Sequence, residues 1–293
     1  MQILLDNQVF QQNASIDETE MTNQIGFMQG RLSSVSKEGV IQEFPWETWK
    51  EEFSIAKECG FKLIEWIFES KDWERNPILL GSGRKEIIQL QKTYGIKVDS
   101  ICCDYFMDHP LFENTEKSQQ VLENLIEASS EVGIRFIELP FIGKAAIHND
   151  NSPIIIKILN AFVPFIKEKG VNLLLEVSIS PEKICKLLDR IPSQRIQLNY
   201  DTGNSAYWGY HPEDEIPVYG HRIGNIHIKD CTPADYSVPL GEGNVDFELI
   251  FNLLKEIKYQ GNFVLQTARG KDDVSLAGKY YKFTQSYIQR YLR

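Results

Sequence analysis

The sequence predicts an α/β protein folded as a single-domain (β/α)8 TIM barrel. Eight apolar, strand-like runs lie along the chain, and most are separated by segments with helical periodicity. The length of 293 residues suits one closed barrel. Neither a GxGxxG nor a GxxxxGK(S/T) motif is present, whereas an open doubly wound sheet would more often carry such a glycine fingerprint.

The chain divides into a short polar arm and the barrel. Residues 1–22 are polar and show no sustained period of either kind, so we expect an N-terminal arm there. We assign residues 23–293 to the barrel. The arm could bridge two subunits, and a homodimer is therefore considered as well.

In the first half of the chain, strand and helix signals alternate. The first helix illustrates the pattern, because Trp49, Phe53 and Ala56 recur at spacings of three and four. Gly60 follows, where a left-handed helix end is favoured. The expected elements are, in order, strand 25–29, helix 46–59, strand 63–67, helix 84–94, strand 98–103, helix 116–132 and strand 136–139.

The second half continues the alternation and completes the barrel. Asp246 is a good N-cap for the last barrel helix, which ends before Gly261. A terminal helix would close the ring against the first unit. The expected elements are helix 153–169, strand 172–177, helix 181–190, strand 196–201, strand 223–229, helix 246–258, strand 262–266 and helix 272–292.

Charge and composition exclude several classes of protein. The formal charge of −10 argues against a broad nucleic-acid surface. The chain has no run of about 18 apolar residues and no secretory leader pattern, which predicts a cytoplasmic protein without a membrane partner. The five cysteines are an odd number without a CxxC pair, so we expect reduced thiols.

Four late strands each end in a side chain that can bind a cation. Glu176, Asp201, His227 and Gln266 are separated by 25, 26 and 39 residues. A period near 25 is about one strand plus one crossover helix, so these side chains would converge at the carboxyl ends of neighbouring strands. Their mixed oxygen and nitrogen donors suit one divalent ion, Mn²⁺, Mg²⁺, Co²⁺ or Zn²⁺.

Each of these residues also has a structural interpretation. Glu176 follows a buried apolar run, where a carboxylate needs a cation or a donor, and a salt bridge would also serve. Asp201 opens the sequence DTGN and could cap the following turn. Gln266 is neutral, so a hydrogen-bonded core amide is nearly as well supported as a ligand.

Further pocket residues follow from their positions near strand ends. Cationic side chains there suit the recognition of phosphate or carboxylate, although exposed surface charge is the alternative. Aromatic residues could form a wall against a sugar, although aromatic residues are more often core. The candidates for substrate binding are Arg31, Glu138, Lys229, Arg269, Trp66 and Tyr105.

The chain resembles a known family over nearly all of residues 24–270. The segments that carry the resemblance are GFMQGRLS, IEWIF, LEVS, DTGNS, HIKD and LGEGNVDF, in this order. They resemble the xylose-isomerase-like TIM barrels, which include sugar and sugar-phosphate isomerases and epimerases of carbohydrate metabolism. The resemblance implies a divalent-metal enzyme whose ligands Glu, Asp, His and Glu correspond to Glu176, Asp201, His227 and Gln266. It also implies that the first and last carboxylates work as a pair of acid/base groups.

Gln266 departs from that pattern, because an amide cannot return a proton. We therefore expect Glu176 to act as the base beside a metal-polarised carbonyl. Glu138 and Asp104 are carboxylates that could supply a second group, and the favoured alternative for each is a solvated loop position or a hydrogen bond in the pocket. Two alternatives stay open. One is a non-catalytic metal or carbohydrate binder. The other is an endonuclease IV-like DNA-repair enzyme, against which the five histidines and the negative charge count.

Overall fold

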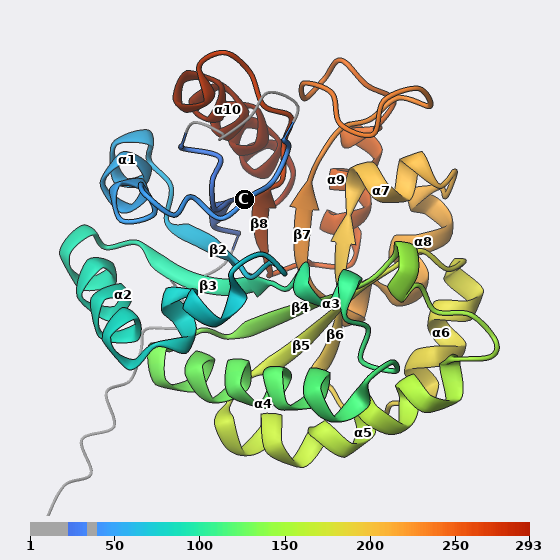
Figure 1. The fold of residues 1–293 in the computed structure, drawn as a ribbon. Helices are drawn as coiled ribbons and strands as arrows, with labels where there is room; N and C mark the ends of the chain where they lie inside the picture. The colour runs from blue at the N-terminus through green and yellow to red at the C-terminus, as the bar shows by residue number, and fades with distance from the viewer. Residues whose placement is uncertain (1–22, 34–39) are drawn as a thin grey trace, which may run out of the picture.

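The computed structural model describes residues 23–33 and 40–293. The arm predicted for residues 1–22 lies outside the described residues. Within the described part, eight parallel strands close into a barrel in sequence order, and the first strand pairs with the last (Figure 1). The strands are β1 (Ile25–Met28), β2 (Leu63–Ile67), β3 (Lys97–Cys102), β4 (Phe136–Phe141), β5 (Asn172–Val177), β6 (Ile196–Asp201), β7 (Ile223–Ile228) and β8 (Asn262–Leu265). The predicted barrel is confirmed.

Helices surround the barrel on its outside (Figure 1). The helices that correspond to predicted ones are α1 (Glu51–Cys59), α2 (Gly81–Tyr94), α4 (Thr115–Val132), α5 (Ser152–Lys169), α6 (Pro181–Asp189), α9 (Phe247–Glu256) and α10 (Asp273–Tyr291). The first helix begins five residues later than predicted, because residues 46–50 form turns. There the Pro45 carbonyl accepts from the amides of Thr48 and Trp49.

Among the described residues, three short helices and four 3-10 turns were not predicted. They are α3 (Tyr105–Asp108), α7 (Thr202–Tyr207), α8 (Pro212–Tyr219), η2 (Trp73–Arg75), η3 (Pro77–Leu79), η4 (Gly143–Ala145) and η5 (Gly220–Arg222). The crossover between β6 and β7 is thus helical, although no helix was expected there. Pro217 lies inside α8, and α7 is only six residues long with few apolar side chains, so neither segment shows a helical period.

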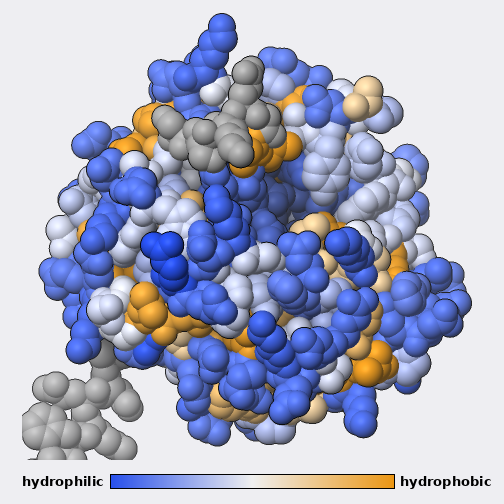
Figure 2. Space-filling model, viewed as in Figure 1, coloured by the Kyte–Doolittle hydropathy of each residue, from blue (hydrophilic) through white to orange (hydrophobic). Residues whose placement is uncertain are grey.

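The core lies inside the barrel and between the barrel and the helices. On β2 the side chains alternate, so that Glu65 points into the barrel while Trp66 packs outward against Trp49, with ring centroids 5.4 Å apart. Near the end of the chain, the ring of Phe251 on α9 stacks on the ring of Phe263 on β8, with ring centroids 5.3 Å apart. The face of the molecule in Figure 2 is mostly hydrophilic, with hydrophobic residues in small groups. No helix among the described residues is long and apolar enough to cross a bilayer.

Candidate active site

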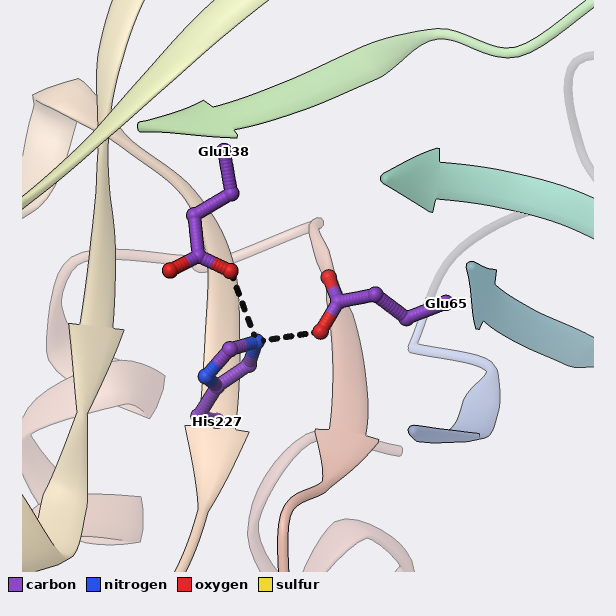
Figure 3. Close-up of side chains that lie close together, drawn as sticks. All are labelled: Glu65, Glu138 and His227. Carbon is purple, nitrogen blue, oxygen red and sulfur yellow. Dashed lines mark ion pairs between the residues drawn. The ribbon is translucent and has the colours of Figure 1, made fainter. Parts of the chain in front are cut away.

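His227 lies at the centre of a ring of four carboxyl groups. It is fully buried on β7. Its Nε2 atom lies 2.7 Å from Glu65 and 3.5 Å from Glu138, and these two side chains reach it from β2 and β4 (Figure 3). Its Nδ1 atom lies 3.6 Å from Glu176 and 3.8 Å from Asp201. The two ring nitrogens therefore face two different pairs of carboxylates.

The close packing of carboxyl groups around His227 shifts the pKa values of these residues. Burial lowers the pKa of His227, but the negative charges of Glu65, Glu176 and Asp201 outweigh burial and raise that pKa to about 9. Burial raises the pKa of Asp201 to about 6, with a partial offset from Lys229. Burial, together with the charge of Glu176 and then of Glu65, raises the pKa of Glu138 well above its usual range. A bound cation would relieve this excess of negative charge.

The residues on β5, β6 and β7 fit a divalent ion. One ligand atom each from Glu176, Asp201 and His227 lies within 4.8 Å of the others. Asp201 Oδ2 and His227 Nδ1 are buried without a hydrogen-bond partner in the described part of the chain, and so is the side-chain oxygen of Gln266. Buried polar atoms of native proteins are normally paired, so the neighbouring atoms of Asp201 and His227 fit a bound cation, and the unpaired oxygen of Gln266 in the cavity wall is a further donor. The donor set of carboxylate, imidazole and amide matches the ligand preferences of Mn²⁺, Mg²⁺, Co²⁺ and Zn²⁺.

Asp201 caps the helix that follows it, and its other carboxylate oxygen lies beside His227. Its Oδ1 atom accepts from the amide of Asn204 at 2.7 Å and caps α7. Its Oδ2 atom stays available on the side of His227. The turn at the end of β6 therefore orients the carboxylate, because one oxygen is fixed by the helix and the other points at the imidazole.

Amide side chains hold Glu176 in place. Asn204 donates to Glu176 Oε1 at 2.5 Å, and Asn199 donates to Glu176 Oε2 at 3.0 Å. Lys229 in turn donates to the side-chain oxygen of Asn204 at 2.8 Å and lies 3.4 Å from the centre of the Tyr236 ring. This chain of bonds fixes the Glu176 carboxylate beside the candidate metal position.

A second group of potential ligands comprises Glu65, Glu138 and His227. Glu65 was missed by the sequence analysis, although a single carboxylate inside the apolar run LIEWI was a signal. Ser100 donates to Glu65 Oε2 at 2.7 Å, and Glu65 Oε1 faces His227 Nε2. Because Glu65 engages Nε2, the Nδ1 side of the ring is the one that is open to an ion.

A cavity of about 180 Å³ opens above these carboxylates at the carboxyl ends of the strands. It brings together five of the predicted site residues, namely Arg31, Glu138, Glu176, Lys229 and Gln266. Asp201 and His227 lie deeper, with 3% and 0% of their surface exposed. The lining also includes residues that were not predicted as ligands or substrate contacts, among them Gln42, Asp104, Asn204 and Tyr236. Gln42 and Tyr236 are loop residues, for which the sequence pattern carries no signal.

Comparisons with known proteins agree with this architecture. The family model described as "Xylose isomerase-like TIM barrel" matches residues 53–286. The chain belongs to this family. The match confirms the resemblance seen in the sequence.

Relatives of this xylose isomerase-like barrel include named sugar epimerases. The chain is 28% identical over 250 residues to "Putative L-ribulose-5-phosphate 3-epimerase SgbU" of Haemophilus influenzae, covering 78% of this chain and 87% of the relative. The structure titled "Structure of L-ribulose 3-epimerase" superposes with a TM-score of 0.71 at 18% identity, covering 92% and 95% of the two chains. A xylose isomerase-like barrel protein from Mycobacterium smegmatis in complex with magnesium gives a TM-score of 0.71 at 18% identity, covering 94% and 99%. At these identities the two structures show a shared fold.

In this xylose isomerase-like barrel, three predicted substrate contacts lie away from the cavity lining. Trp66 is fully buried between β2 and α1, and its Nε1 donates to Asn76 at 2.9 Å. Tyr105 is also fully buried, and its ring packs on Phe68. Arg269 lies behind Arg31, where it forms an ion pair with Asp273 at 3.0 Å. The two aromatic residues thus occupy core positions in the structure.

Proposed function

We propose that this protein is a divalent-metal-dependent epimerase of a small sugar or sugar phosphate that uses Glu176 as a base. The observation that carries the proposal is that ligand atoms of Asp201, His227 and Gln266 are buried without a hydrogen-bond partner among the described residues, at a cavity lined by Glu176 and Gln266. Its sugar-epimerase relatives and the magnesium complex of a similar barrel support this reading. The site has one histidine among carboxylates, which does not favour the histidine-rich endonuclease alternative.

The residues of this chain would act in distinct ways. Glu176, Asp201, His227 and Gln266 would hold the ion, which supplies a positive charge to polarise a substrate carbonyl. Glu176, oriented by Asn199 and Asn204, would remove the proton from the carbon next to that carbonyl. Returning a proton to the opposite face of the same carbon gives the epimer. This second step needs another acid, and Gln266 cannot provide it.

Glu138 is the carboxyl group best placed for the second step. It lies on β4 and lines the same cavity as Glu176. Its Oε2 atom has no hydrogen-bond partner within the described residues, and His227 lies 3.5 Å away. Glu138 would therefore take the acid/base position that Gln266 cannot fill. Gln266 itself favours a second candidate, aldose–ketose isomerisation, in which Glu176 alone carries the proton between adjacent carbons.

The test combines metal analysis with turnover. The purified protein, loaded with Mn²⁺, Mg²⁺, Co²⁺ or Zn²⁺, is assayed on ketopentoses and their 5-phosphates, and its metal content is measured. Glu176→Gln is expected to retain the ion and lose activity by about 10²- to 10⁴-fold. His227→Ala is expected to lose both the ion and activity. The exposed Glu182→Gln serves as the matched control and should behave as the wild type.

Two results would contradict the proposal. Wild-type protein that binds no ion under loading conditions would exclude the metal site. Protein that binds the ion but turns over no sugar would instead indicate the non-catalytic binder. Solvent deuterium should enter the substrate at one carbon, whereas full retention of substrate hydrogen would indicate a hydride shift.

A further inference from the structure

Arg31 is a buried cation that forms no ion pair with any carboxylate in residues 23–33 or 40–293. It follows β1 in the wall of the cavity and has only 4% of its surface exposed. Its Nε donates to the carbonyl of Thr267 at 3.0 Å, and its Nη1 donates to the carbonyl of Ile41 at 2.7 Å. Its Nη2 is buried and has no hydrogen-bond partner among the described residues. Two neutral carbonyls fix the guanidinium, and its Nη2 atom is left without an acceptor in the described part of the chain.

A second guanidinium stands beside the first. Burial, and next the positive charge of Arg269, lower the pKa of Arg31 to about 10. Arg269 is held by Asp273 and by the carbonyl of Ser33, while its Nε and Nη1 atoms are buried without a partner in the part of the chain that is described. Arg269 does not line the cavity, so it adds positive charge near Arg31, and Arg31 is the guanidinium that an anion in the cavity would meet.

The other cation of the cavity is already engaged. Lys229 donates to Asn204 and lies over the ring of Tyr236, and its charge acts on Asp201. The ammonium group of Lys229 therefore serves the metal side of the cavity. An anionic group on a substrate would gain more from Arg31, whose contacts are carbonyls.

Asp104 is the acidic group that faces Arg31 across the cavity lining. Its charge acts on Arg31, and burial raises the pKa of Asp104. Gln42 and Cys102 both donate to this carboxyl group. Within the described residues, Asp104 forms its hydrogen bonds with these two side chains and none with the Arg31 guanidinium.

The loop that carries Arg31 is fixed before any ligand binds. Both carboxylate oxygens of Glu52, on α1, accept from the amide of Gly30 at 2.9 and 3.0 Å, and one of them accepts from Leu32 at 3.1 Å. Gly30 has a φ of +85°, and a Cβ atom there would lie 2.8 Å from the carbonyl oxygen of Glu43. The chain on both sides of Arg31 is thus held in one conformation.

We propose that Arg31, with Arg269 behind it, binds the phosphate of a phosphorylated ketose whose reacting carbons lie next to Glu176. In the closed barrel β1 and β5 are four strands apart, so Arg31 and Glu176 lie on opposite sides of one cavity. A substrate with its carbonyl at the metal position and its phosphate at Arg31 would extend across the cavity. This inference rests on the proposed function and names its substrate class.

The test compares one ketopentose with its 5-phosphate. Metal-loaded wild type should prefer the phosphorylated substrate. Arg31→Gln should lower kcat/KM for the 5-phosphate on the order of 100-fold while changing kcat/KM for the free ketopentose little, and Arg31→Lys should recover part of the loss. Arg293→Gln, at the exposed end of the chain, is the matched control. Equal losses on both substrates, or a wild type that prefers the free sugar, would overturn the proposal.

A binding measurement separates this proposal from the proposed function. Inorganic phosphate is titrated calorimetrically into metal-free wild type, Arg31→Gln, Arg31→Lys and Arg293→Gln, and thermal melting checks that each variant is folded. Binding to wild type, Arg31→Lys and the control, but not to Arg31→Gln, would support the anion site even if no sugar is turned over. If wild type binds no phosphate, or if Arg31→Gln binds it equally well, the Arg31 site is wrong whatever the enzyme activity.

Discussion

Glu65 and His227 meet across the inside of the barrel, with Glu65 Oε1 2.7 Å from His227 Nε2. The two residues lie on β2 and β7, which are not neighbours in the sheet. A carboxylate that accepts from one ring nitrogen of a histidine fixes the orientation of the ring and strengthens the other nitrogen as a ligand. Glu65 therefore directs His227 Nδ1 towards Glu176 and Asp201.

Loss of the Glu65 contact, which orients the His227 ring, should weaken metal binding. We expect Glu65→Ala to lower the affinity for Mn²⁺ by about 10- to 100-fold, because mutating a residue that hydrogen-bonds to a metal-ligating histidine typically lowers metal affinity by that factor. Glu65→Gln keeps an acceptor oxygen and should lose less. Calorimetric titration of the metal-free proteins measures both. Affinity that is unchanged in Glu65→Ala would show that the contact does not orient the ligand.

A charged residue at position 266 should strengthen the site. Gln266 has a buried oxygen without a hydrogen-bond partner in the described structure, and replacing the amide with a carboxylate adds a negative ligand. We predict that Gln266→Glu raises the affinity for a divalent ion on the order of tenfold. The same titration tests this. No change would place Gln266 outside the ligand set.

Glu138→Gln distinguishes epimerisation from isomerisation. If Glu138 returns the proton on the second face, the variant should lose epimerisation by about 10²- to 10⁴-fold. Exchange of the substrate proton with deuterated solvent should continue, because Glu176 is intact. NMR of the substrate in D₂O follows both reactions at once. Product formation at the wild-type rate would assign the whole proton transfer to Glu176, and Glu182→Gln is again the control.

The stability of the protein should depend on Glu52 and on pH. Burial raises the pKa of Glu52 from 4.5 to about 7, although the amides of Gly30 and Leu32 lower it in part. The folded state therefore binds a proton more tightly than the unfolded chain. The resulting stabilisation is complete below about pH 4.5 and disappears as the pH rises through 7.

Comparison with Glu52→Gln isolates this contribution. The free energy of unfolding of the wild type, relative to that of the variant, should fall by about 3 kcal/mol between pH 4.5 and 7. Urea unfolding at several pH values gives the difference. A constant difference over this range would mean that Glu52 has the same pKa in the folded and unfolded states.

The sequence predicted the barrel well because its strands are apolar runs of regular spacing, and closure follows from eight such units. The positions of Glu176, Asp201 and His227 could be predicted for the same reason, since each ends its own strand or lies near its end. The pairing of Glu65 with His227 could not be predicted, because it joins two strands that are not neighbours in the barrel.

Other features depended on loops and on side-chain direction. Trp66 was considered as a sugar contact, yet alternation along β2 turns it outward once Glu65 points inward. The open nitrogen of Arg31 depends on the carbonyls of Ile41 and Thr267, whose positions are set by loops without a repeating pattern. The cytoplasmic location and the homodimer stay predictions.

Hydrogen bonds of Arg31 and Arg269 join the loop after the first strand of the barrel to the loop after the last strand. Three of the four candidate metal ligands, Glu176, Asp201 and His227, come from the consecutive strands β5, β6 and β7, and only Gln266 follows β8. By contrast, the bond from Arg31 to Thr267 and that from Arg269 to Ser33 each span 236 residues. During synthesis, β5 to β7 emerge from the ribosome before β8, so the wall around Arg31 is complete only when the last strand docks on the first. Phosphate binding at Arg31 would consequently report that the ring has closed, whereas metal binding could precede closure.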